Sequence, residues 1–170
     1  MSKTPRLELI IDSREQKSLK DEFKAGIFDI IISKKLEYGD YGCTIDGKEV
    51  PIYFERKGLG DLFGTLTKDH KRFGRELHRA KLSCHQLILL VEGSLRDVAS
   101  GYSHSSISGD TIIKTIFSLW VRHGLYPVFC NGRRECARFI EETYTAVARS
   151  FSIKGKRSGA EHEDERKLAE

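Results

Sequence analysis

The chain has 170 residues, 39% of them hydrophobic, and a formal net charge of +4 at pH 7. This length suits one domain with a real core and is too short for two domains of ordinary size. No window approaches the roughly 20 uncharged apolar residues of a membrane helix, and the first residues lack the apolar region of a signal peptide. The cysteines form no CxxC pair. We therefore expect a globular, cytoplasmic protein with reduced thiols.

Strand and helix patterns alternate along the chain. In order, they predict a strand at 7–11, a short helix at 18–24, strands at 28–33, 41–45 and 50–57, helical segments from 60 to 81 broken near Asp69, a strand at 86–91, a helix around 112–120 capped by Ser108 or Asp110, a strand at 126–129 and a helix at 133–150. Asp46-Gly47 is a strong hairpin signal. This order predicts an α/β fold with a mixed central β-sheet flanked by helices.

The end of the chain differs from its body in composition. Residues 151–170 carry five basic and five acidic side chains and, beyond Phe151 and Ile153, almost nothing apolar to bury. Such a segment cannot bury enough apolar surface to order itself. We therefore expect one folded domain over 1–151 and a disordered, charged tail over 152–170.

Acidic and basic residues converge on the predicted hairpin. Because strand side chains alternate, Glu55 and Lys57 share one face. Phe54 and Arg56 share the other face, which we expect to meet the core. The hairpin can bring Asp40 beside Glu55, and two carboxylates near a lysine suit a hard divalent cation such as Mg²⁺ or Mn²⁺. A cross-strand surface ion pair is the alternative explanation of the same residues.

Further carboxylates flank this hairpin in the sequence. Asp12 and Glu15 directly follow the first predicted strand, and Asp61 begins the helix after Lys57. A strand end commonly points at a site. A buried cluster of four or five carboxylates would need a metal ion or Lys57 to compensate its charge.

Three separated blocks, Asp12-Ser13-Arg14-Glu15, Gly39-Asp40-Tyr41 and Glu55-Arg56-Lys57-x-x-x-Asp61, occur in a recognisable order. They resemble the nuclease domain of the XPF family of structure-specific endonucleases, which belongs to the PD-(D/E)XK superfamily. The segments 62–66, 72–73 and 87–93 also look like the helix and following strand of that family. The resemblance extends over about residues 7 to 150 and implies a restriction-endonuclease-like fold.

The resemblance implies roles for individual residues. Asp40 and Glu55 would bind a catalytic Mg²⁺, or Mn²⁺, and Lys57 would assist the attacking water. Asp12 and Glu15 would complete the acidic cluster and could hold a second ion. Arg56 and Asp61 fall on motif positions and are further candidates for the catalytic set. A structural ion pair for Arg56 and a helix N-terminal carboxylate for Asp61 are the alternatives.

The implied reaction is hydrolysis of DNA phosphodiester bonds to a 5′-phosphate and a 3′-hydroxyl at branched, flap or fork DNA, in repair or recombination.

Residues 68–81 carry six basic side chains and two acidic ones. The candidate DNA-binding residues are Arg14, Lys68, Arg72, Arg75 and Arg79, with a solvated helix face as the alternative for the last four. The resemblance also implies a homodimer.

The chain departs from the family in two respects. Well-studied members carry a tandem helix-hairpin-helix module after the nuclease domain, and we expect none in 152–170, so this looks like a stand-alone nuclease domain of bacterial, archaeal or phage type. Glu76 stands where many relatives have glutamine. Two alternatives stay open: a catalytically silent nuclease-like module for DNA binding or dimerisation, and a Holliday-junction resolvase of the same superfamily.

Overall fold

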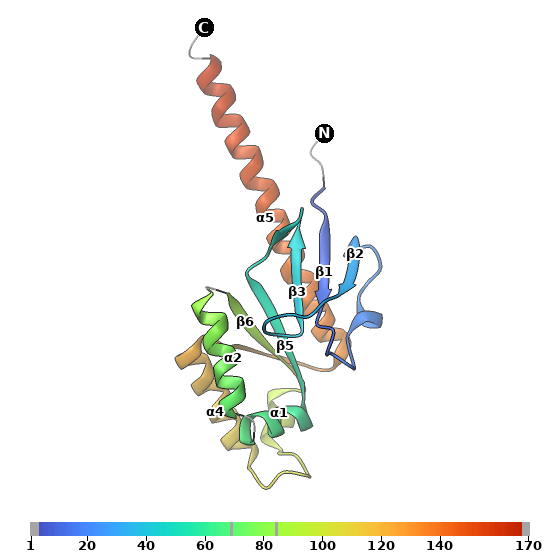
Figure 1. The fold of residues 1–170 in the computed structure, drawn as a ribbon, viewed down its shortest axis with the longest axis vertical. Coiled ribbons are helices and arrows are strands. Elements are labelled where there is room, and N and C mark those ends of the chain that lie inside the picture. Colours follow the sequence, from blue (N-terminus) through green and yellow to red (C-terminus); the bar gives the residue numbers. More distant parts are fainter. Residues whose placement is uncertain (1–3, 69, 84, 168–170) are drawn as a thin grey trace.

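The computed structural model describes residues 4–68, 70–83 and 85–167 (Figure 1). Its centre is one mixed sheet of seven strands in the order β2-β1-β3-β5-β6-β7, with β4 paired to β3. The strands are β1 (Leu7–Ile11), β2 (Ile30–Ser33), β3 (Tyr41–Ile45), β4 (Lys48–Glu49), β5 (Ile52–Gly58), β6 (Gln86–Glu92) and β7 (Tyr126–Cys130). β3 runs antiparallel to β1 and β5, whereas β1 and β2, β5 and β6, and β6 and β7 pair in parallel.

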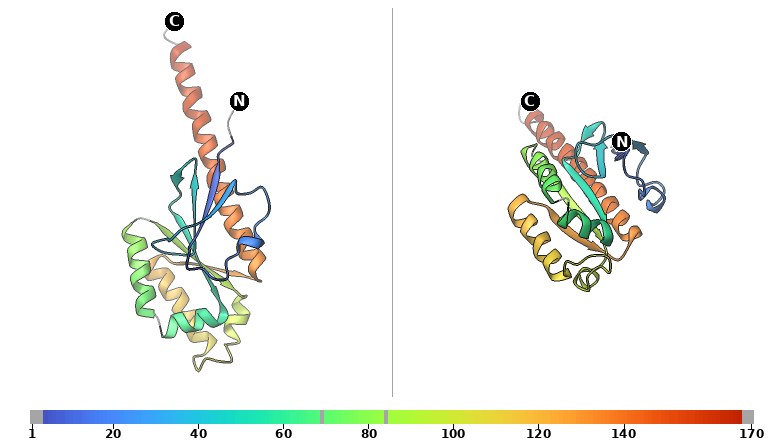
Figure 2. Two further views of the ribbon diagram at one scale, coloured as in Figure 1. Left: turned by 45° about the vertical axis from the view of Figure 1, so that its right-hand side comes forward. Right: turned by 60° about the horizontal axis from the view of Figure 1, so that its bottom comes forward.

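Helices cover both faces of this sheet (Figure 2). They are α1 (Leu59–Thr67), α2 (His70–Leu82), α3 (Leu95–Ala99), α4 (Gly109–His123) and α5 (Arg133–Lys167), with a short 3-10 helix at Lys20–Glu22. On one face, Tyr41 and Phe54 pack with Tyr144 of α5. On the other face, Tyr53 and Leu89 pack in the cluster that includes residues of α1, α2 and α4. The predicted mixed sheet flanked by helices is therefore confirmed.

The alternation of side chains on β5 divides its polar residues between these two faces. Phe54 belongs to the cluster under α5, and Tyr53 belongs to the opposite cluster. Because side chains alternate, Glu55 and Lys57 project to the same side as Tyr53, and Arg56 projects to the side of Phe54. The sequence pattern predicts this division, although it assigns a core to one face only.

Turn and cap residues behave as predicted at two places. Asp46 and Gly47 adopt φ values of 49° and 75° in the tight turn between β3 and β4, as a two-residue hairpin requires. Ser108 is the N-cap of α4, and its side chain accepts a hydrogen bond from the N–H of Thr111. The expected break near Asp69 falls between α1 and α2, and Asp69 itself lies outside the described residues.

Other elements differ from the prediction. The helix expected at 18–24 is only a 3-10 turn, and this segment buries Leu19 alone deeply, which is too little for an apolar helical face. The strand expected from Phe28 begins at Ile30, and the short helix α3 has too few apolar residues for a periodic signal. Helix α5 continues to Lys167 instead of ending at Ser150. A helical backbone satisfies its own hydrogen bonds without an apolar face, so periodicity does not reveal this extension. The boundary between domain and tail stays a prediction.

None of the helices within the described ranges combines the length and the apolar character needed to cross a membrane.

Candidate active site

The backbone places Asp40 beside β5. The N–H of Asp40 donates to the carbonyl of Phe54 at 2.7 Å, and the N–H of Arg56 donates to Asp40 Oδ2 at 2.8 Å. Gly39, just before it, has a φ of +72°, and a Cβ there would lie 3.0 Å from the carbonyl oxygen of Phe54. Glycine is therefore required at this turn, because the φ is positive and there is no room for a side chain. The turn places Asp40 against β5, the strand that carries Glu55.

Glu55 and Lys57 meet on one side of β5. Glu55 is 6% exposed, and Lys57 Nζ forms an ion pair with Glu55 Oε1. The Lys57 side chain is 19% exposed, so its ammonium group is held at the border between the site and solvent. The structure thus brings together Asp40, Glu55 and Lys57, the three residues that the sequence places at the centre of the site.

The two carboxylates repel each other in a site of low polarity. Burial and the nearby charge of Asp40 together raise the pKa of Glu55 to about 8, although Lys57 opposes the shift. Burial also raises the pKa of Asp40 to about 6, against the hydrogen bond from the N–H of Arg56. Burial lowers the pKa of Lys57, but the charge and hydrogen bond of Glu55, together with the charges of Asp40 and Glu76, outweigh burial and leave the pKa raised. Lys57 therefore carries its positive charge at neutral pH.

These features fit a divalent cation. Asp40 and Glu55 supply hard carboxylate oxygens, which are the ligands that Mg²⁺ and Mn²⁺ prefer. One lysine cannot neutralise two buried carboxylates, and a doubly charged ion between them would lower the pKa of both. Within the described residues, no group of three or more His, Cys, Asp or Glu side chains is arranged to hold a metal ion.

Asp12 is engaged elsewhere in this arrangement. It is 3% exposed, and its two oxygens accept hydrogen bonds from Nε and Nη2 of Arg14 at 2.8 and 2.9 Å. The N–H of Leu36 donates to Asp12 Oδ2 at 2.7 Å. Burial would raise the pKa of Asp12, but the hydrogen bonds from Arg14 and Leu36 outweigh it and lower that pKa. Asp12 therefore acts here as the anchor of two loop segments, and its predicted role as a metal ligand stays a prediction.

Arg56 projects to the opposite side from Glu55. Its Nη2 donates to Glu15 Oε1 at 2.7 Å and to the carbonyl of Lys17 at 2.7 Å, and its Nη1 donates to Glu92 Oε1 at 2.5 Å. The Arg56 side chain is 9% exposed, and its buried Nε has no hydrogen-bond partner among the described residues. The structural ion pair, given above as the alternative for Arg56, is thus what the structure contains. Glu15 is turned toward this arginine.

Two further acidic residues lie near the site in different surroundings. Asp61 lies exposed in the first turn of α1, a position that the helix dipole favours for a carboxylate. Glu92 pairs with Arg56, although it is not among the site residues that the sequence predicts. Its position directly after the apolar run of β6 is the signal that could have identified it, because strand ends in such sheets gather polar groups.

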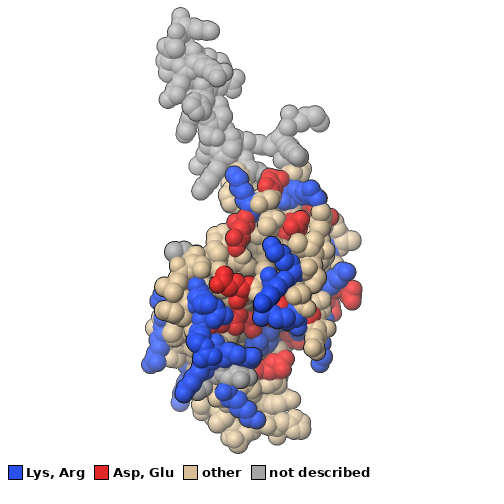
Figure 3. Space-filling model, in the orientation of Figure 1, with Lys and Arg blue, Asp and Glu red and all other residues tan. Residues whose placement is uncertain are grey.

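Helix α2 lies beside the carboxylates and carries basic residues on its outer face. Phe73, Leu77 and Ala80 are buried, whereas the basic side chains predicted to contact DNA are exposed: Lys68, Arg72, Arg75 and Arg79. Figure 3 shows Lys and Arg side chains gathered on this side, next to a central acidic region. Helix α2 therefore has one buried face and one basic, exposed face.

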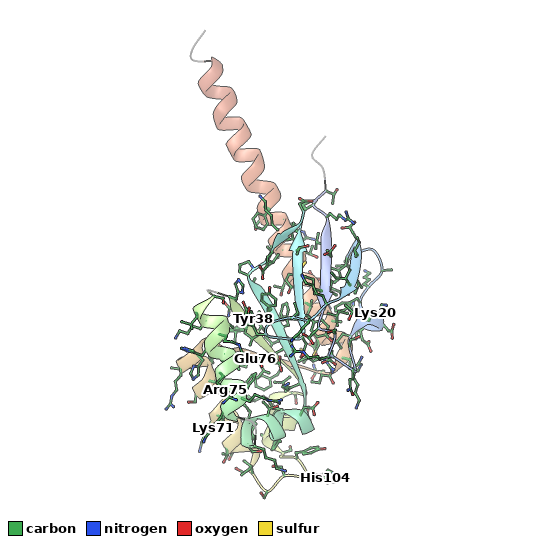
Figure 4. All side chains as sticks on the ribbon, in the orientation of Figure 1. Lys20, Tyr38, Lys71, Arg75, Glu76 and His104 are labelled. Atoms are coloured by element: carbon green, nitrogen blue, oxygen red, sulfur yellow. The ribbon has the colours of Figure 1, made fainter. Side chains whose placement is uncertain are left out.

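Glu76 is the exception on this helix. It is half-buried, and its Oε1 accepts a hydrogen bond from the N–H of Gly39 at 2.9 Å. Figure 4 places Glu76 between α2 and β5. Its negative charge is close enough to add to the raised pKa of Glu55, after the larger effects of burial and Asp40. Glu76 is therefore a further member of the site, which the residue pattern alone does not identify.

Two other segments have structural roles. Tyr102, in the polar loop before α4, packs on Phe63 of α1 with ring centroids 5.9 Å apart. Cys130 and Cys136 are both buried and unoxidised, and a hydrogen bond with Cys136 lowers the pKa of Cys130. Both cysteines therefore contribute to packing between β7 and α5.

Comparisons with known proteins identify the family and the fold of this chain. The model of the ERCC4 domain matches residues 11–143. XPF from Aeropyrum pernix has a similar structure, with a TM-score of 0.59 and 21% identity over 88% of this chain and 69% of that chain. The same protein in complex with DNA gives a TM-score of 0.56 and 20% identity over 85% of this chain and 66% of that chain. This chain thus spans about two thirds of the length of that relative.

A comparison with curated protein sequences finds no match. At about 20% identity the likeness to XPF shows the fold, and the family follows from the match of the ERCC4 domain over most of the chain. Membership of this family supports a DNA endonuclease of the XPF type. The chain belongs to the ERCC4 domain family.

Proposed function

We propose that this chain is a metal-dependent DNA endonuclease that hydrolyses phosphodiester bonds at branched, flap or fork DNA. The observation that carries the proposal is the convergence of Asp40, Glu55 and Lys57 at one side of β5, with the ion pair between Glu55 and Lys57. Buried carboxylates with raised pKa values are typical of functional sites. Their position beside a basic helix is what a phosphodiester substrate requires.

Asp40 and Glu55 would hold the metal, for which we propose Mg²⁺, with Mn²⁺ as the alternative. When bound, such an ion activates a water molecule and neutralises charge on the phosphate. Lys57 would keep its ammonium group at the scissile phosphate, because Glu55 orients it and its raised pKa keeps it protonated. Burial of the site excludes water and strengthens these electrostatic effects.

The DNA backbone would pass along α2. The exposed residues Arg72, Arg75 and Arg79 lie on the side of α2 away from its buried residues, and Lys68, at the end of α1, adds a fourth exposed basic side chain. Arg14 lies close enough to Glu76 and Asp40 for their charges to act on its guanidinium group, and its side chain is 62% exposed. It would add a phosphate contact while the same guanidinium group stays bound to Asp12. The structure of XPF with DNA supports binding of the same ligand class here.

We also propose that the chain forms a homodimer. Phe117, Trp120 and Tyr126 form an exposed aromatic group, with ring centroids 5.9 and 5.6 Å apart along the series. Val121 beside them is 83% exposed, and the group adjoins the edge strand β7. Aromatic side chains are enriched at protein interfaces, so this surface suits a second copy. Sedimentation of wild type and Trp120→Glu would show a dimer that the charge disrupts.

Cleavage of labelled DNA tests the enzymatic proposal. Flap, fork, four-way junction and linear duplex substrates would be incubated with Mg²⁺ or Mn²⁺ and with wild type, Asp40→Asn, Glu55→Gln or the surface control Glu142→Gln. We expect wild type and the control to cleave flap or fork DNA and the two site variants to lose activity. Equal cleavage by the site variants would contradict the site. Binding without cleavage by wild type would instead favour the catalytically silent module, and preference for the junction would favour a resolvase.

A further inference from the structure

Glu76 joins helix α2 to the turn that carries Asp40. Its carboxylate accepts a hydrogen bond from the N–H of Gly39 at 2.9 Å, although the two residues are 37 positions apart. Glu76 is half-buried between α2 and β5 (Figure 4), whereas Arg75 next to it is exposed. The contact therefore connects the inner side of α2, whose outer face is basic, with the backbone beside the candidate metal site.

The polar groups of this turn bind to three different parts of the fold. The N–H of Asp40 donates to the carbonyl of Phe54, and the carbonyl of Asp40 accepts from the N–H of Asp12 at 2.8 Å. Asp40 Oδ2 accepts from the N–H of Arg56. Strand β5 and the loop after β1 thus hold Asp40 itself. The N–H of Gly39 is held by Glu76, which makes α2 the third support of the turn.

The surroundings of Gly39 limit how its backbone can respond if the hydrogen bond to Glu76 is lost. Gly39 is buried with a positive φ, and the carbonyl oxygen of Phe54 and the side chain of Leu87 lie against it. A buried N–H without a partner costs about 1–3 kcal/mol. Loss of the acceptor would therefore favour rotation of the peptide before Gly39 toward another partner, and that rotation would shift Asp40.

We propose that Glu76 is a positioning residue, which fixes Asp40 relative to the basic helix α2 through the N–H of Gly39. This inference rests on the function proposed above, because it assigns to α2 both the contact with DNA and the support of a metal-binding carboxylate. What the role requires is an acceptor oxygen at the end of the side chain. A glutamine amide has this oxygen, whereas a methionine of similar length does not.

The test compares Glu76→Gln and Glu76→Met with wild type and with Glu142→Met, a matched control at an exposed glutamate of α5. Cleavage of flap DNA would be measured against Mg²⁺ concentration. We expect Glu76→Met to lose about 10–100-fold in metal affinity or in rate, as is typical when a residue that orients a metal ligand is removed. Glu76→Gln keeps the acceptor oxygen and should therefore lose much less than Glu76→Met, whereas the control should follow the wild-type curve. The affinity for DNA in Ca²⁺, which measures the basic surface alone, should be the same in the three variants as in wild type.

Amide hydrogen exchange of Gly39, followed by NMR, tests the contact without reference to activity. We expect protection of this N–H in wild type and Glu76→Gln and faster exchange in Glu76→Met. Unchanged protection in Glu76→Met, or equal impairment of Glu76→Gln and Glu76→Met, would overturn the positioning role. If wild type failed to cleave DNA, the proposed function would be wrong, whereas the exchange measurement would still decide whether Glu76 supports the turn.

Discussion

Arg56 and Glu92 link the neighbouring parallel strands β5 and β6 through a hydrogen bond of 2.5 Å between Nη1 and Oε1. The same guanidinium group binds Glu15 and the carbonyl of Lys17. It therefore fastens the loop after β1 to the two strands that carry the site. The Arg56 side chain is buried on the face opposite Glu55. Its contacts hold the backbone of the same residue in place, and the N–H of that backbone donates a hydrogen bond to Asp40.

Replacement of Arg56 should destabilise the protein. Arg56→Met removes the buried arginine partner of two largely buried carboxylates, Glu15 and Glu92, and leaves Glu92 only the longer contact of 3.9 Å with Arg133. We expect a loss of about 3 kcal/mol in the free energy of unfolding, as is typical when one partner of a buried ion pair is removed. Arg56→Lys should recover only part of this loss, because an ammonium group lacks the planar fork. Urea unfolding measures the effect.

Arg138→Met is the matched control for this experiment. Arg138 is 71% exposed on α5 and lies 4.0 Å from Glu142. Exposed ion pairs of this kind contribute about 0–1 kcal/mol. Similar unfolding free energies for Arg56→Met and Arg138→Met would show that Arg56 has no clamping role.

Lys57 should be required for cleavage but not for DNA binding. Its ammonium group is fixed by Glu55 and projects to the candidate site, apart from the basic surface on α2. Lys57→Met should lower the single-turnover rate by about 10²–10⁴-fold, the range for a group that assists proton transfer or charge development. The affinity for flap DNA in Ca²⁺ should change little. A large loss of affinity with an unchanged rate would assign Lys57 to substrate binding instead.

Asp40→Asn should stabilise the metal-free protein while it removes activity. The pKa of Asp40 is raised from 3.8 to about 6, mainly by burial. The ionised form of Asp40 is therefore less favourable in the folded chain than in the unfolded chain, which lowers the free energy of unfolding. This loss of stability is absent below about pH 3.8, grows as the pH rises, and is complete above about pH 6. An asparagine avoids that cost. At pH 8 with a chelator, we expect a gain of about 1–2 kcal/mol in urea unfolding.

The pH dependence provides the control for Asp40→Asn. The difference in stability between the variant and wild type should shrink as the pH falls from 8 to 4. It should also shrink when Mg²⁺ is added to wild type, because a bound ion stabilises the folded protein by mass action. A difference that is constant with pH would mean that the charge of Asp40 does not cause it.

Asp12→Asn should have the opposite effect. The pKa of Asp12 is lowered, because hydrogen bonds from Arg14 and Leu36 outweigh the effect of burial. Its stabilising contribution is therefore present above its ordinary pKa of 3.8 and is lost as the pH falls through the lower value of the folded chain. At pH 7 we expect Asp12→Asn to lose about 1–3 kcal/mol, with or without metal, whereas Asp110→Asn, at an exposed site on α4, should change stability little. A neutral result for Asp12→Asn would contradict the anchoring role.

The sequence predicts the convergence of Asp40, Glu55 and Lys57 because strand geometry is local. Alternation on β5 separates Glu55 and Lys57 from Arg56, and the turn at Asp46 and Gly47 returns the chain so that Asp40 reaches β5. These relationships depend on a few neighbouring residues. The order of strands and helices likewise suffices to predict a mixed sheet covered by helices.

The partners of the outlying carboxylates depend on contacts that no local pattern contains. Asp12 faces the N–H of Leu36, which is 24 residues away, and Glu15 turns to Arg56, 41 residues away. Both residues were expected to join Asp40 in one acidic cluster. The contact of Glu76 with Gly39 spans two elements in the same way. Long-range choices of this kind decide which carboxylates face a metal site and which anchor loops.

Gly39→Ala should impair both folding and cleavage. An alanine there would keep the strained φ of +72°, and its Cβ would lie 3.0 Å from the carbonyl oxygen of Phe54. Gly47→Ala offers a matched control, because Gly47 has a φ of +75° and a Cβ there would meet no atom within 4 Å. Gly47→Ala should cost about 1 kcal/mol from backbone strain alone.

The excess cost of Gly39→Ala measures how tightly the turn is packed against β5. We expect Gly39→Ala to lose at least about 1 kcal/mol more than Gly47→Ala in urea unfolding, because the close approach to a backbone oxygen adds to the strain. It should also slow cleavage at saturating Mg²⁺, since Asp40 follows directly, whereas Gly47→Ala should cleave at the wild-type rate. Equal stability and equal cleavage of the two variants would show that the position of Asp40 does not depend on the tight packing of this turn.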